Sequence, residues 1–340
     1  MTNKICISGY YGFDNFGDET ILKILVENLK KMKNIDEITV FSSNPDKTSK
    51  NLGVNSVRTF CPKDVITSLF KSTCLISGGG SLLQDVTSKK SIIYYLMVLA
   101  IAQFFHKKTI IFAQGIGPIN NKFLAKITEF ILKKATYTTV RDENSYTLLN
   151  KWGIKSSLCS DPVWNLEVND IKKSNKIGVQ LRSFSSLTDE KLSDLAFCIN
   201  KYYQNKEILL ISLQNSLDIG VCKKLKEKLT NLNSNLKVEI IENSSNDKII
   251  EIISSLDELI AMRYHACLVA IKCGVKLLPI SYDIKVKTIA KEFNLPYIDL
   301  ENPQDNISND FEDFIKNKTS YNIEKIENLK FNFNELEKHL

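Results

Sequence analysis

Short apolar runs alternate along the chain with longer segments whose apolar residues recur at helical spacing. In the first half, the runs with the length and composition of buried strands are residues 4–8, 37–41, 74–77, 109–113 and 137–140. The segments 20–32 and 143–152 have the period of amphipathic helices. Strands that alternate with helices predict a parallel sheet covered by helices on its faces.

The second half repeats the alternation after a polar, charged segment, which we interpret as a linker. Its predicted strands are 176–181, 208–213, 238–241, 256–262, 276–280 and 297–300, and its predicted helices are 188–200, 221–229, 248–255, 266–274 and 286–293. We therefore expect an α/β protein with two Rossmann-like, doubly wound domains facing a cleft, as in the GT-B fold. The expected parts are an N-terminal domain over 1–165, a C-terminal domain over 176–305 and a C-terminal helical tail over 306–340.

Composition narrows the class of protein only slightly. The 340 residues are 43% hydrophobic and 25% charged, as in soluble globular proteins, and 45 basic residues are interleaved with 39 acidic ones. The net charge of +6 argues against nucleic acid as the partner and fits anionic small substrates or a membrane surface. The eight cysteines form no CxxC pair, so neither a zinc site nor a disulfide framework is expected.

The chain begins directly with a predicted strand, so we expect no signal peptide and a cytoplasmic location. The longest apolar segment, residues 91–105, is too short to span a bilayer comfortably. We interpret it as a buried helix, with a helix that faces a membrane as the alternative.

Three predicted strands of the first half each end in glycines, at residues 9–17, 78–80 and 115–117. Glycine lets another group approach the backbone closely, and recurrence at three strand ends favours a ligand cleft at one edge of the sheet. The first loop precedes a helix, which is the layout that presents N–H groups to an anion, although its spacing is not GxGxxG. A tight turn is the alternative, and Asp18 and Glu19 then serve only the helix start.

An arginine and a histidine stand between two apolar runs near residue 264. Arg263 ends a predicted strand and His265 begins the next helix, so the pair offers a fixed cation and a group that moves a proton. The alternative is a capping histidine and a solvated arginine. Arg141 and Arg182 also follow predicted strands, and an ion pair with Asp142 or Glu143 is the other interpretation of Arg141.

Several segments together resemble the polysaccharide pyruvyl transferase family, in its bacterial CsaB-type branch. They run in family order and cover most of the chain. They are GYYG at 9–12 with NFGDE at 15–19, SGGGS at 77–81, QGIGP at 114–118, VRDE at 140–143, SDP at 160–162, MRYHA at 262–266 and YDIKV at 282–286.

The resemblance implies transfer of a pyruvyl group from phosphoenolpyruvate onto two hydroxyls of a sugar, giving a cyclic ketal and phosphate. In the CsaB-type branch the acceptor resembles a lipid-linked, N-acetylmannosamine-containing precursor of a secondary cell-wall polymer. The ketal there anchors S-layer homology domains. The expected partners are thus the donor phosphoenolpyruvate, a lipid-linked glycan and, peripherally, the inner face of the cytoplasmic membrane, with no cofactor and no metal.

The family's positions for donor binding and catalysis correspond to Arg141, Arg263, His265 and Lys285, with Ile284 standing where the family often has proline. His265 protonates either the methylene carbon or the leaving phosphate, and the sequence leaves both open. We expect Lys285 to hold the carboxylate and Arg182 to assist. The other residues expected to bind substrate, with the acceptor at the first loop, are Gly12, Asn15, Gly17, Asp18, Gly79, Gly80 and Gln114.

Two rival functions fit the same architecture. A GT-B glycosyltransferase usually needs an acidic residue in its second domain for the nucleotide ribose, and Glu251 and Glu258 are available, but the candidate cluster is basic. A non-catalytic protein that binds wall glycans would use the basic cluster only to grip an anionic glycan. Its sequence mark would be loss of the Arg/His/Lys set, which is intact here.

Overall fold

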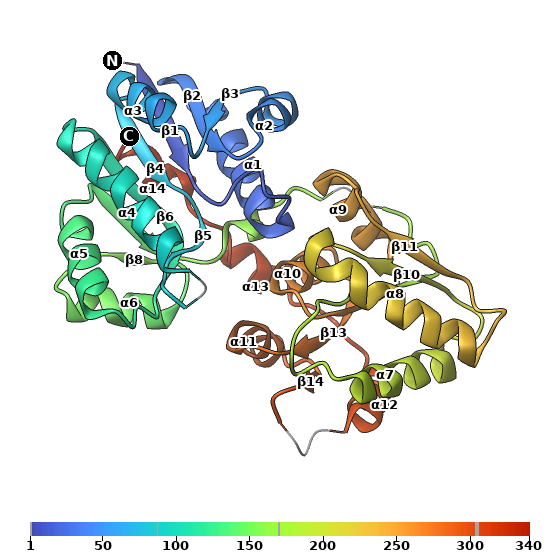
Figure 1. Cartoon of the computed structure of the whole chain (residues 1–340). Helices are drawn as coiled ribbons and strands as arrows, with labels where there is room; N and C mark the ends of the chain where they lie inside the picture. The colour runs from blue at the N-terminus through green and yellow to red at the C-terminus, as the bar shows by residue number, and fades with distance from the viewer. Residues whose placement is uncertain (1, 87, 169–170, 303–305) are drawn as a thin grey trace. The chain divides into compact units, whose positions relative to one another are not determined.

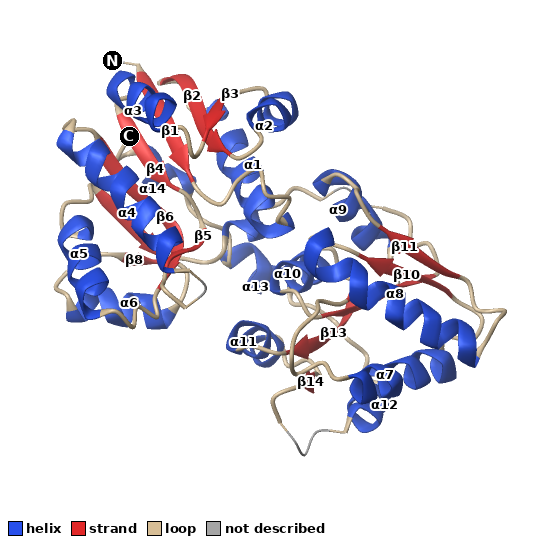
Figure 2. Ribbon diagram, in the orientation of Figure 1, coloured by secondary structure: helices blue, strands red, loops and turns tan. Residues whose placement is uncertain are grey.

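The computed structural model describes residues 2–86, 88–168, 171–302 and 306–340 (Figure 1). The chain divides into two compact units. The first unit contains Met1–Asn165 and Glu327–Leu340, and the second contains Leu166–Ile326. Each unit is a layered α/β structure with a sheet between helices (Figure 2).

The sheet of the first unit is parallel throughout, in the order β3-β2-β1-β4-β6-β7-β8, with β5 beside β6. Its strands are β1 (Asn3–Ser8), β2 (Ile35–Ser42), β3 (Asn55–Arg58), β4 (Cys74–Ser77), β5 (Gly80–Leu83), β6 (Lys108–Ile116), β7 (Tyr137–Val140) and β8 (Ser157–Leu158). Every residue of β4 is buried, as expected for a central parallel strand covered on both faces.

The helices of the first unit are α1 (Phe16–Lys31), α2 (Pro45–Leu52), α3 (Pro62–Lys71), α4 (Lys89–Phe104), α5 (Lys122–Leu132), α6 (Glu143–Lys151), the 3₁₀ turn η1 (Pro162–Asn165) and α14 (Phe333–Glu337). Side-chain caps set several starts: Asn15, Asn44 and Asn121 each accept a backbone N–H of the first turn. Helix α1 also has Asp18 and Glu19 in its first turn, as its dipole favours.

The sheet of the second unit has the order β11-β10-β9-β12-β13-β14 and is also parallel. Its strands are β9 (Lys176–Gln180), β10 (Glu207–Ile211), β11 (Val238–Ile241), β12 (Glu258–Ala261), β13 (Lys276–Ser281) and β14 (Ile298–Asp299). Its helices are α7 (Asp189–Tyr202), α8 (Asn215–Leu232), α9 (Asn246–Ser255), α10 (Tyr264–Lys272), α11 (Ile284–Glu292), α12 (Ile307–Lys316) and α13 (Ile323–Asn328).

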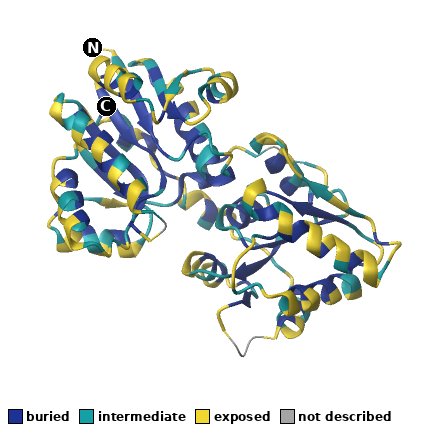
Figure 3. Ribbon diagram, viewed as in Figure 1, coloured by how far each residue is buried: buried dark blue, intermediate teal, exposed yellow. Residues whose placement is uncertain are grey.

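The predicted fold class is confirmed, because both sheets are parallel and their strands alternate with helices. In each unit the buried residues lie along the strands and the inward faces of the helices (Figure 3). The strand order reverses between β1 and β4 in the first unit and between β9 and β12 in the second. Ligands of open parallel sheets bind at such reversals, outside the carboxyl ends of the strands.

The structure corrects the prediction in several places. The elements α2, β3, α3 and α5 are present although the sequence analysis does not predict them. Strand β6 continues to Ile116, so the predicted strand end at 113 is wrong and Gln114 lies inside the strand. The interpretation of Gly80 as part of a loop is also wrong, because β5 begins there and pairs with β6 at Gln114.

The predicted tail from residue 306 is not a separate body. Helix α12 packs in the core of the second unit through Phe311 and Phe314, whereas α14 belongs to the first unit. The boundary expected at 305 lies outside the described residues. Within the described part of the chain, no helix has the length and apolar character needed to cross a membrane.

Candidate functional site

The strand reversal of the second unit places two arginines at one edge of the sheet. Arg182 follows β9 after a single intervening residue, and Arg263 follows β12, the strand beside it. The backbone N–H of Arg263 donates to Oε1 of the buried Gln180 (2.8 Å), and that of Arg182 donates to Sδ of Met262 (3.4 Å). These contacts join the two strand ends, so both arginines start from a fixed backbone.

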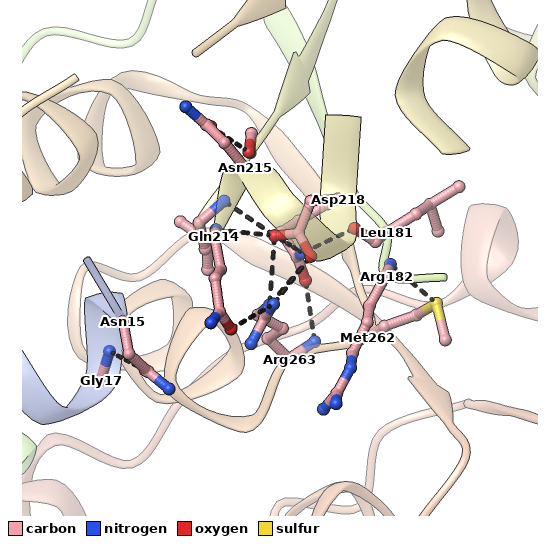
Figure 4. A network of polar contacts seen from close by, with 12 residues as sticks. Asn15, Gly17, Leu181, Arg182, Gln214, Asn215, Asp218, Met262 and Arg263 are labelled. Carbon is pink, nitrogen blue, oxygen red and sulfur yellow. Dashed lines mark hydrogen bonds and ion pairs between the residues drawn. The ribbon is translucent and has the colours of Figure 1, made fainter. Parts of the chain in front are cut away.

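The guanidinium of Arg263 is held by Asp218, in the first turn of α8 (Figure 4). Its Nη2 lies 2.7 Å from Oδ1 of Asp218, and its Nε lies 3.1 Å from Oδ2. Nη2 also donates to Oε1 of Gln214 (3.2 Å). The Asp218 side chain has no exposed surface and that of Arg263 is 12% exposed, so this ion pair is almost wholly buried.

Asp218 is itself fixed by the start of its helix. Its Oδ2 accepts the backbone N–H groups of Leu213 (2.9 Å) and Gln214 (3.0 Å), which precede α8. The carboxylate therefore closes the turn after β10 and orients Arg263 with the same two oxygens. Within the described residues, Nη1 of Arg263 makes no hydrogen bond, so its two N–H groups are left for an anion.

Arg182 is oriented by aromatic side chains. Its Nη1 donates to the hydroxyl of Tyr282 (3.2 Å), and its Cζ lies 5.6 Å from the centre of that ring. Tyr282 in turn packs on Phe184, with ring centres 4.7 Å apart. Burial raises the pKa of Tyr282, the nearby charge of Asp283 raises it further, and both Arg182 and Arg263 act to lower it. Both arginines therefore lie close enough to Tyr282 to affect its pKa.

His265 is the second residue of α10, and Arg263, two positions before it in the chain, is the N-cap residue. Its Nε2 is buried, and its ring meets that of Tyr264 edge to face at 5.3 Å. The N-cap residue makes no side-chain cap to this helix. Lys285 is the second residue of the next helix, α11, where its backbone N–H donates to Oδ1 of Asp283 (3.0 Å) and its side chain is exposed.

The structure thus brings Arg182, Arg263, His265 and Lys285 to the carboxyl edge of three adjacent strands, β9, β12 and β13. Gln180, Gln214, Asp218 and Tyr282 complete this group, and the sequence analysis assigned none of them a role. Within the described residues, no group of three His, Cys, Asp or Glu side chains is placed to bind a metal ion.

In the first unit, the glycine loop after β1 is tied to the start of α1. Asn15 caps the helix through the N–H of Gly17 (3.1 Å), and Glu19 accepts the N–H of Gly12 (2.7 Å). Burial raises the pKa of Glu19 to about 7, against the opposing effect of the bond from Gly12. Helix α1 begins four residues before the predicted start, so Gly17 and Asp18 belong to its first turn.

The protein's own side chains occupy the space beside several glycines of this unit. A Cβ on Gly78 would lie 1.8 Å from the hydroxyl of Tyr11, and one on Gly79 would lie 2.8 Å from Cγ2 of Ile21. A Cβ on Gly80, which has a φ of +93°, would lie 2.5 Å from Oδ1 of Asp18. The close approach expected at these glycines is therefore made by α1 and its preceding loop.

Gly12 and Gln114 also have internal partners. Gly12 has a φ of +80°, and a Cβ there would meet the turn after β2 at Ser42. Gln114 is fully buried, and its Nε2 donates to Oγ of Ser77 and to the carbonyl of Gly78, both at 2.7 Å. This amide joins β6 to the end of β4, which is one of the two strands at the first unit's strand reversal.

Arg141 pairs with an acidic residue that the sequence analysis did not consider. Its Nη1 lies 2.5 Å from Oδ2 of Asp161, and both side chains are buried. Asp142, which with Glu143 was the alternative partner for Arg141, instead caps α6 by accepting the N–H of Ser145 (2.9 Å). Arg141 lies in the first unit and the other predicted donor-binding residues lie in the second, so its part in donor binding stays a prediction.

A series of aromatic rings beside the first loop is a feature that sequence reasoning missed. The rings of Tyr10 and Phe13 stack at 4.2 Å, Phe13 meets Phe60 at 6.3 Å, and Phe60 meets Tyr94 of α4 at 5.3 Å. Their positions are far apart in the sequence, and Phe60 lies in the turn between β3 and α3, neither of which was predicted.

A model of the polysaccharide pyruvyl transferase family matches residues 15–284, which is more than half of the chain. This chain belongs to that family. The match includes Arg141, Arg263 and His265, whereas Gly12 and Lys285 lie just outside its two ends. The family indicates a transferase of pyruvyl groups in polysaccharide biosynthesis. A comparison with curated proteins gives no significant match.

Solved structures similar to this chain share its fold at low sequence identity. The UDP-GlcNAc 2-epimerase from Methanocaldococcus jannaschii is 13% identical with a TM-score of 0.66, covering 95% of both chains. A putative UDP-N-acetylglucosamine 2-epimerase from Listeria monocytogenes is 10% identical with a TM-score of 0.65, covering 93% of this chain and 89% of its own. Anabaena Alr3699/HepE, solved with UDP and glucose, is 10% identical with a TM-score of 0.61, over 93% and 90% of the chains. The likeness shows a GT-B type of fold and leaves the chemistry to the family match and the site.

Proposed function

We propose that this protein transfers the pyruvyl group of phosphoenolpyruvate onto two hydroxyls of a sugar as a cyclic ketal, and that the second unit binds the donor. The observation that carries the proposal is the Arg263–Asp218 pair at the strand reversal, with His265 two residues later in the chain. Phosphoenolpyruvate carries a phosphate and a carboxylate, and guanidinium groups bind both kinds of anion in bidentate geometry.

The donor is held by cations of unequal mobility in this proposal. Arg263 is rigid because Asp218 fixes its Nε and Nη2, and Arg182 is oriented by Tyr282. Both suit a phosphate that must stay in place while its ester bond breaks. Lys285, exposed on the next helix, binds the carboxylate as a point charge.

The chemistry requires one proton on carbon and one on phosphate. A proton added to the methylene carbon makes C2 electrophilic, and a sugar hydroxyl then bonds to C2. The C2–O bond to phosphate breaks, and a second hydroxyl of the same sugar closes the ketal. The reaction consumes two protons, one for the new methyl group and one for the released phosphate. The two sugar hydroxyls release two protons as their oxygens bond to C2. His265 supplies the first proton as a general acid, a step typically worth about 10²–10⁴-fold in rate.

The acceptor in this proposal is bound by the first unit, at the loop that Glu19 and Asn15 hold in place. The exposed aromatic Phe60 and its neighbours Phe13 and Tyr94 offer apolar ring faces to a sugar there. We propose an acceptor containing N-acetylmannosamine, linked to lipid, as in the precursors of secondary cell-wall polymers whose ketals anchor S-layer homology domains. Such an acceptor places the protein at the inner face of the cytoplasmic membrane.

Product analysis tests this proposal. Purified protein is incubated with phosphoenolpyruvate and a synthetic lipid-linked N-acetylmannosaminyl disaccharide. The molecular mass of the acceptor is then measured by mass spectrometry. The proposal predicts a mass gain of one carboxyethylidene group together with one released phosphate. A nucleotide-sugar glycosyltransferase would instead add a hexosyl group from a UDP-sugar and ignore phosphoenolpyruvate. A glycan-binding protein would leave the acceptor unchanged.

A further inference from the structure

Three helices that lie side by side on one face of the first unit expose large apolar side chains. Helix α4 contacts both α3 and α5, and the inward residues of all three share one hydrophobic core (Figure 1). The most exposed large apolar side chains of these helices are Phe104 (77%), Phe123 (71%), Phe70 (65%) and Phe130 (60%). We call this surface the α3–α4–α5 face.

The outward side of α4 is an unbroken apolar stripe. Ile93, Met97, Ala100 and Phe104 recur at spacings of three or four residues, so they lie along one side of the helix, and all four are exposed. Because the opposite side of α4 packs in the core, the helix is apolar almost all round. Helices of that kind are normally buried completely. The stripe from Ile93 to Phe104 extends roughly 17 Å along the helix.

The charges around this stripe are almost all of one sign. The segments 62–71, 89–107 and 122–134 contain nine lysines against Asp64 and Glu129, a formal charge of +7. The whole chain has only +6, so the rest of the molecule contributes a net charge of −1. The lysines are Lys63, Lys71, Lys89, Lys90, Lys107, Lys122, Lys126, Lys133 and Lys134.

Some of these lysines stand directly beside the exposed rings. Nζ of Lys134 lies 4.0 Å from the ring centre of Phe130, and Nζ of Lys107 lies 5.8 Å from that of Phe70. Phe70 also meets Phe105, which meets Phe104, so the ends of α3 and α4 share an aromatic cluster. Apolar side chains with ammonium groups at their edges match a bilayer surface, where acyl chains lie below anionic headgroups.

We infer that the α3–α4–α5 face binds the surface of an anionic lipid membrane, with α4 parallel to the bilayer plane. The phenylalanines enter the boundary between headgroups and acyl chains, and the lysines contact anionic headgroups. Such a face concentrates the protein where a lipid-linked acceptor lies, and in that respect alone the inference rests on the proposed function.

Charge argues against the other occupants of an apolar face. A second copy that paired through the same face would bring +7 against +7 across a desolvated interface. Nucleic acid would match the lysines but would leave the phenylalanines without an apolar partner. An anionic bilayer is the partner that satisfies both features.

Vesicle flotation tests the inference directly. The full-length protein is mixed with vesicles of phosphatidylcholine alone or of equal parts phosphatidylcholine and phosphatidylglycerol. We expect binding to the anionic vesicles only, and a loss of at least about tenfold in affinity for Met97→Glu/Phe104→Glu. The matched control is Phe197→Glu/Ile323→Glu, two residues of the second unit that are 56% and 76% exposed, and it should bind as the wild type does.

A second variant separates the charge from the apolar stripe. Lys89→Gln/Lys90→Gln/Lys133→Gln/Lys134→Gln should weaken binding and flatten its dependence on salt, because fewer headgroup contacts remain to be screened. Both variants should keep the wild-type melting temperature, since the changed side chains are exposed. The inference would be overturned if the wild-type protein did not bind anionic vesicles. It would also be overturned if the protein bound no vesicles but formed a dimer that Phe104→Glu converts to monomers.

The inference and the proposed function fail separately. Phosphate release with a short-chain, water-soluble acceptor should be the same for the wild type and the face variants. Vesicle binding without any phosphate release would leave the membrane face standing and remove the proposed function. Phosphate release without vesicle binding would support the proposed function and remove the membrane face.

Discussion

Asp218 fixes Arg263 with the same carboxylate that closes the start of α8. Nη2 of Arg263 lies 2.7 Å from Oδ1 of Asp218, and Oδ2 accepts two backbone N–H groups. A buried ion pair stabilises little on balance, but the loss of one partner leaves the other as an uncompensated charge. The pair therefore makes both the stability of the second unit and the orientation of Arg263 depend on one carboxylate.

Asp218→Asn should destabilise the protein by about 3–5 kcal/mol and lower turnover, because Arg263 loses its ionic partner. Chemical denaturation measures the first effect and the release of phosphate from phosphoenolpyruvate the second. The control is Asp189→Asn, whose side chain is 73% exposed and pairs with Lys228 at 2.9 Å. Its free energy of unfolding should change far less than that of Asp218→Asn, because solvent screens an exposed ion pair. Equal effects of the two variants would contradict the account.

Glu19 should make the stability of the first unit fall as the pH rises. Its pKa is raised to about 7 by burial, so the folded chain binds this proton more tightly than the unfolded chain does. Its contribution is therefore complete below the carboxyl's ordinary pKa near 4.5 and is lost as the pH rises through about 7.

Glu19→Gln should remove that loss, raising stability at pH 8 by about 1–3 kcal/mol while the amide oxygen still accepts the Gly12 N–H. Thermal unfolding at several pH values between 5 and 8 measures the effect. Glu27→Gln, an exposed residue on the same helix, is the control and should leave the pH profile unchanged. A Glu19→Gln profile parallel to that of the wild type would show that the carboxyl is not protonated in this range.

Gly80 and Gly220 provide a matched pair of glycine substitutions. Gly80→Ala places a Cβ 2.5 Å from Oδ1 of Asp18 at a φ of +93°, so it should destabilise the protein by more than about 1 kcal/mol. Gly220 lies inside α8 with no atom within 4 Å of an added Cβ, and Gly220→Ala should stabilise it by about 0.5–1 kcal/mol. Denaturation midpoints measure both, and opposite signs are the expected result.

Apolar periodicity in the sequence was enough to predict the central strands. Elements and contacts that depend on polar residues were missed. Apolar runs located both sets of central strands, and the junction near Arg263 followed from them. Helix α2 and strand β3 were missed because their sequences are mostly polar and have little apolar periodicity. The glycine at 115 suggested a loop, but it lies inside β6, where a Cβ would meet Oγ of Ser81 at 2.8 Å.

Partners of the site residues were beyond reach of the sequence for a different reason. Asp218 is 45 residues before Arg263, and its role depends on β10 and β12 lying on opposite sides of β9. Asp161 likewise reaches Arg141 from a turn after β8. Both acidic residues are buried by the tertiary fold, and the local sequence does not show which arginine each of them pairs with.

The most direct test of the central claim is the rate of acceptor-dependent phosphate release by His265→Asn compared with His106→Asn. His106 is exposed in the first unit with a φ of +55°, a conformation that asparagine adopts readily, so its variant controls for the loss of a histidine. The account predicts a loss of about 10²–10⁴-fold for His265→Asn at an unchanged melting temperature, and wild-type turnover for His106→Asn. Undiminished phosphate release by a folded His265→Asn variant would contradict it.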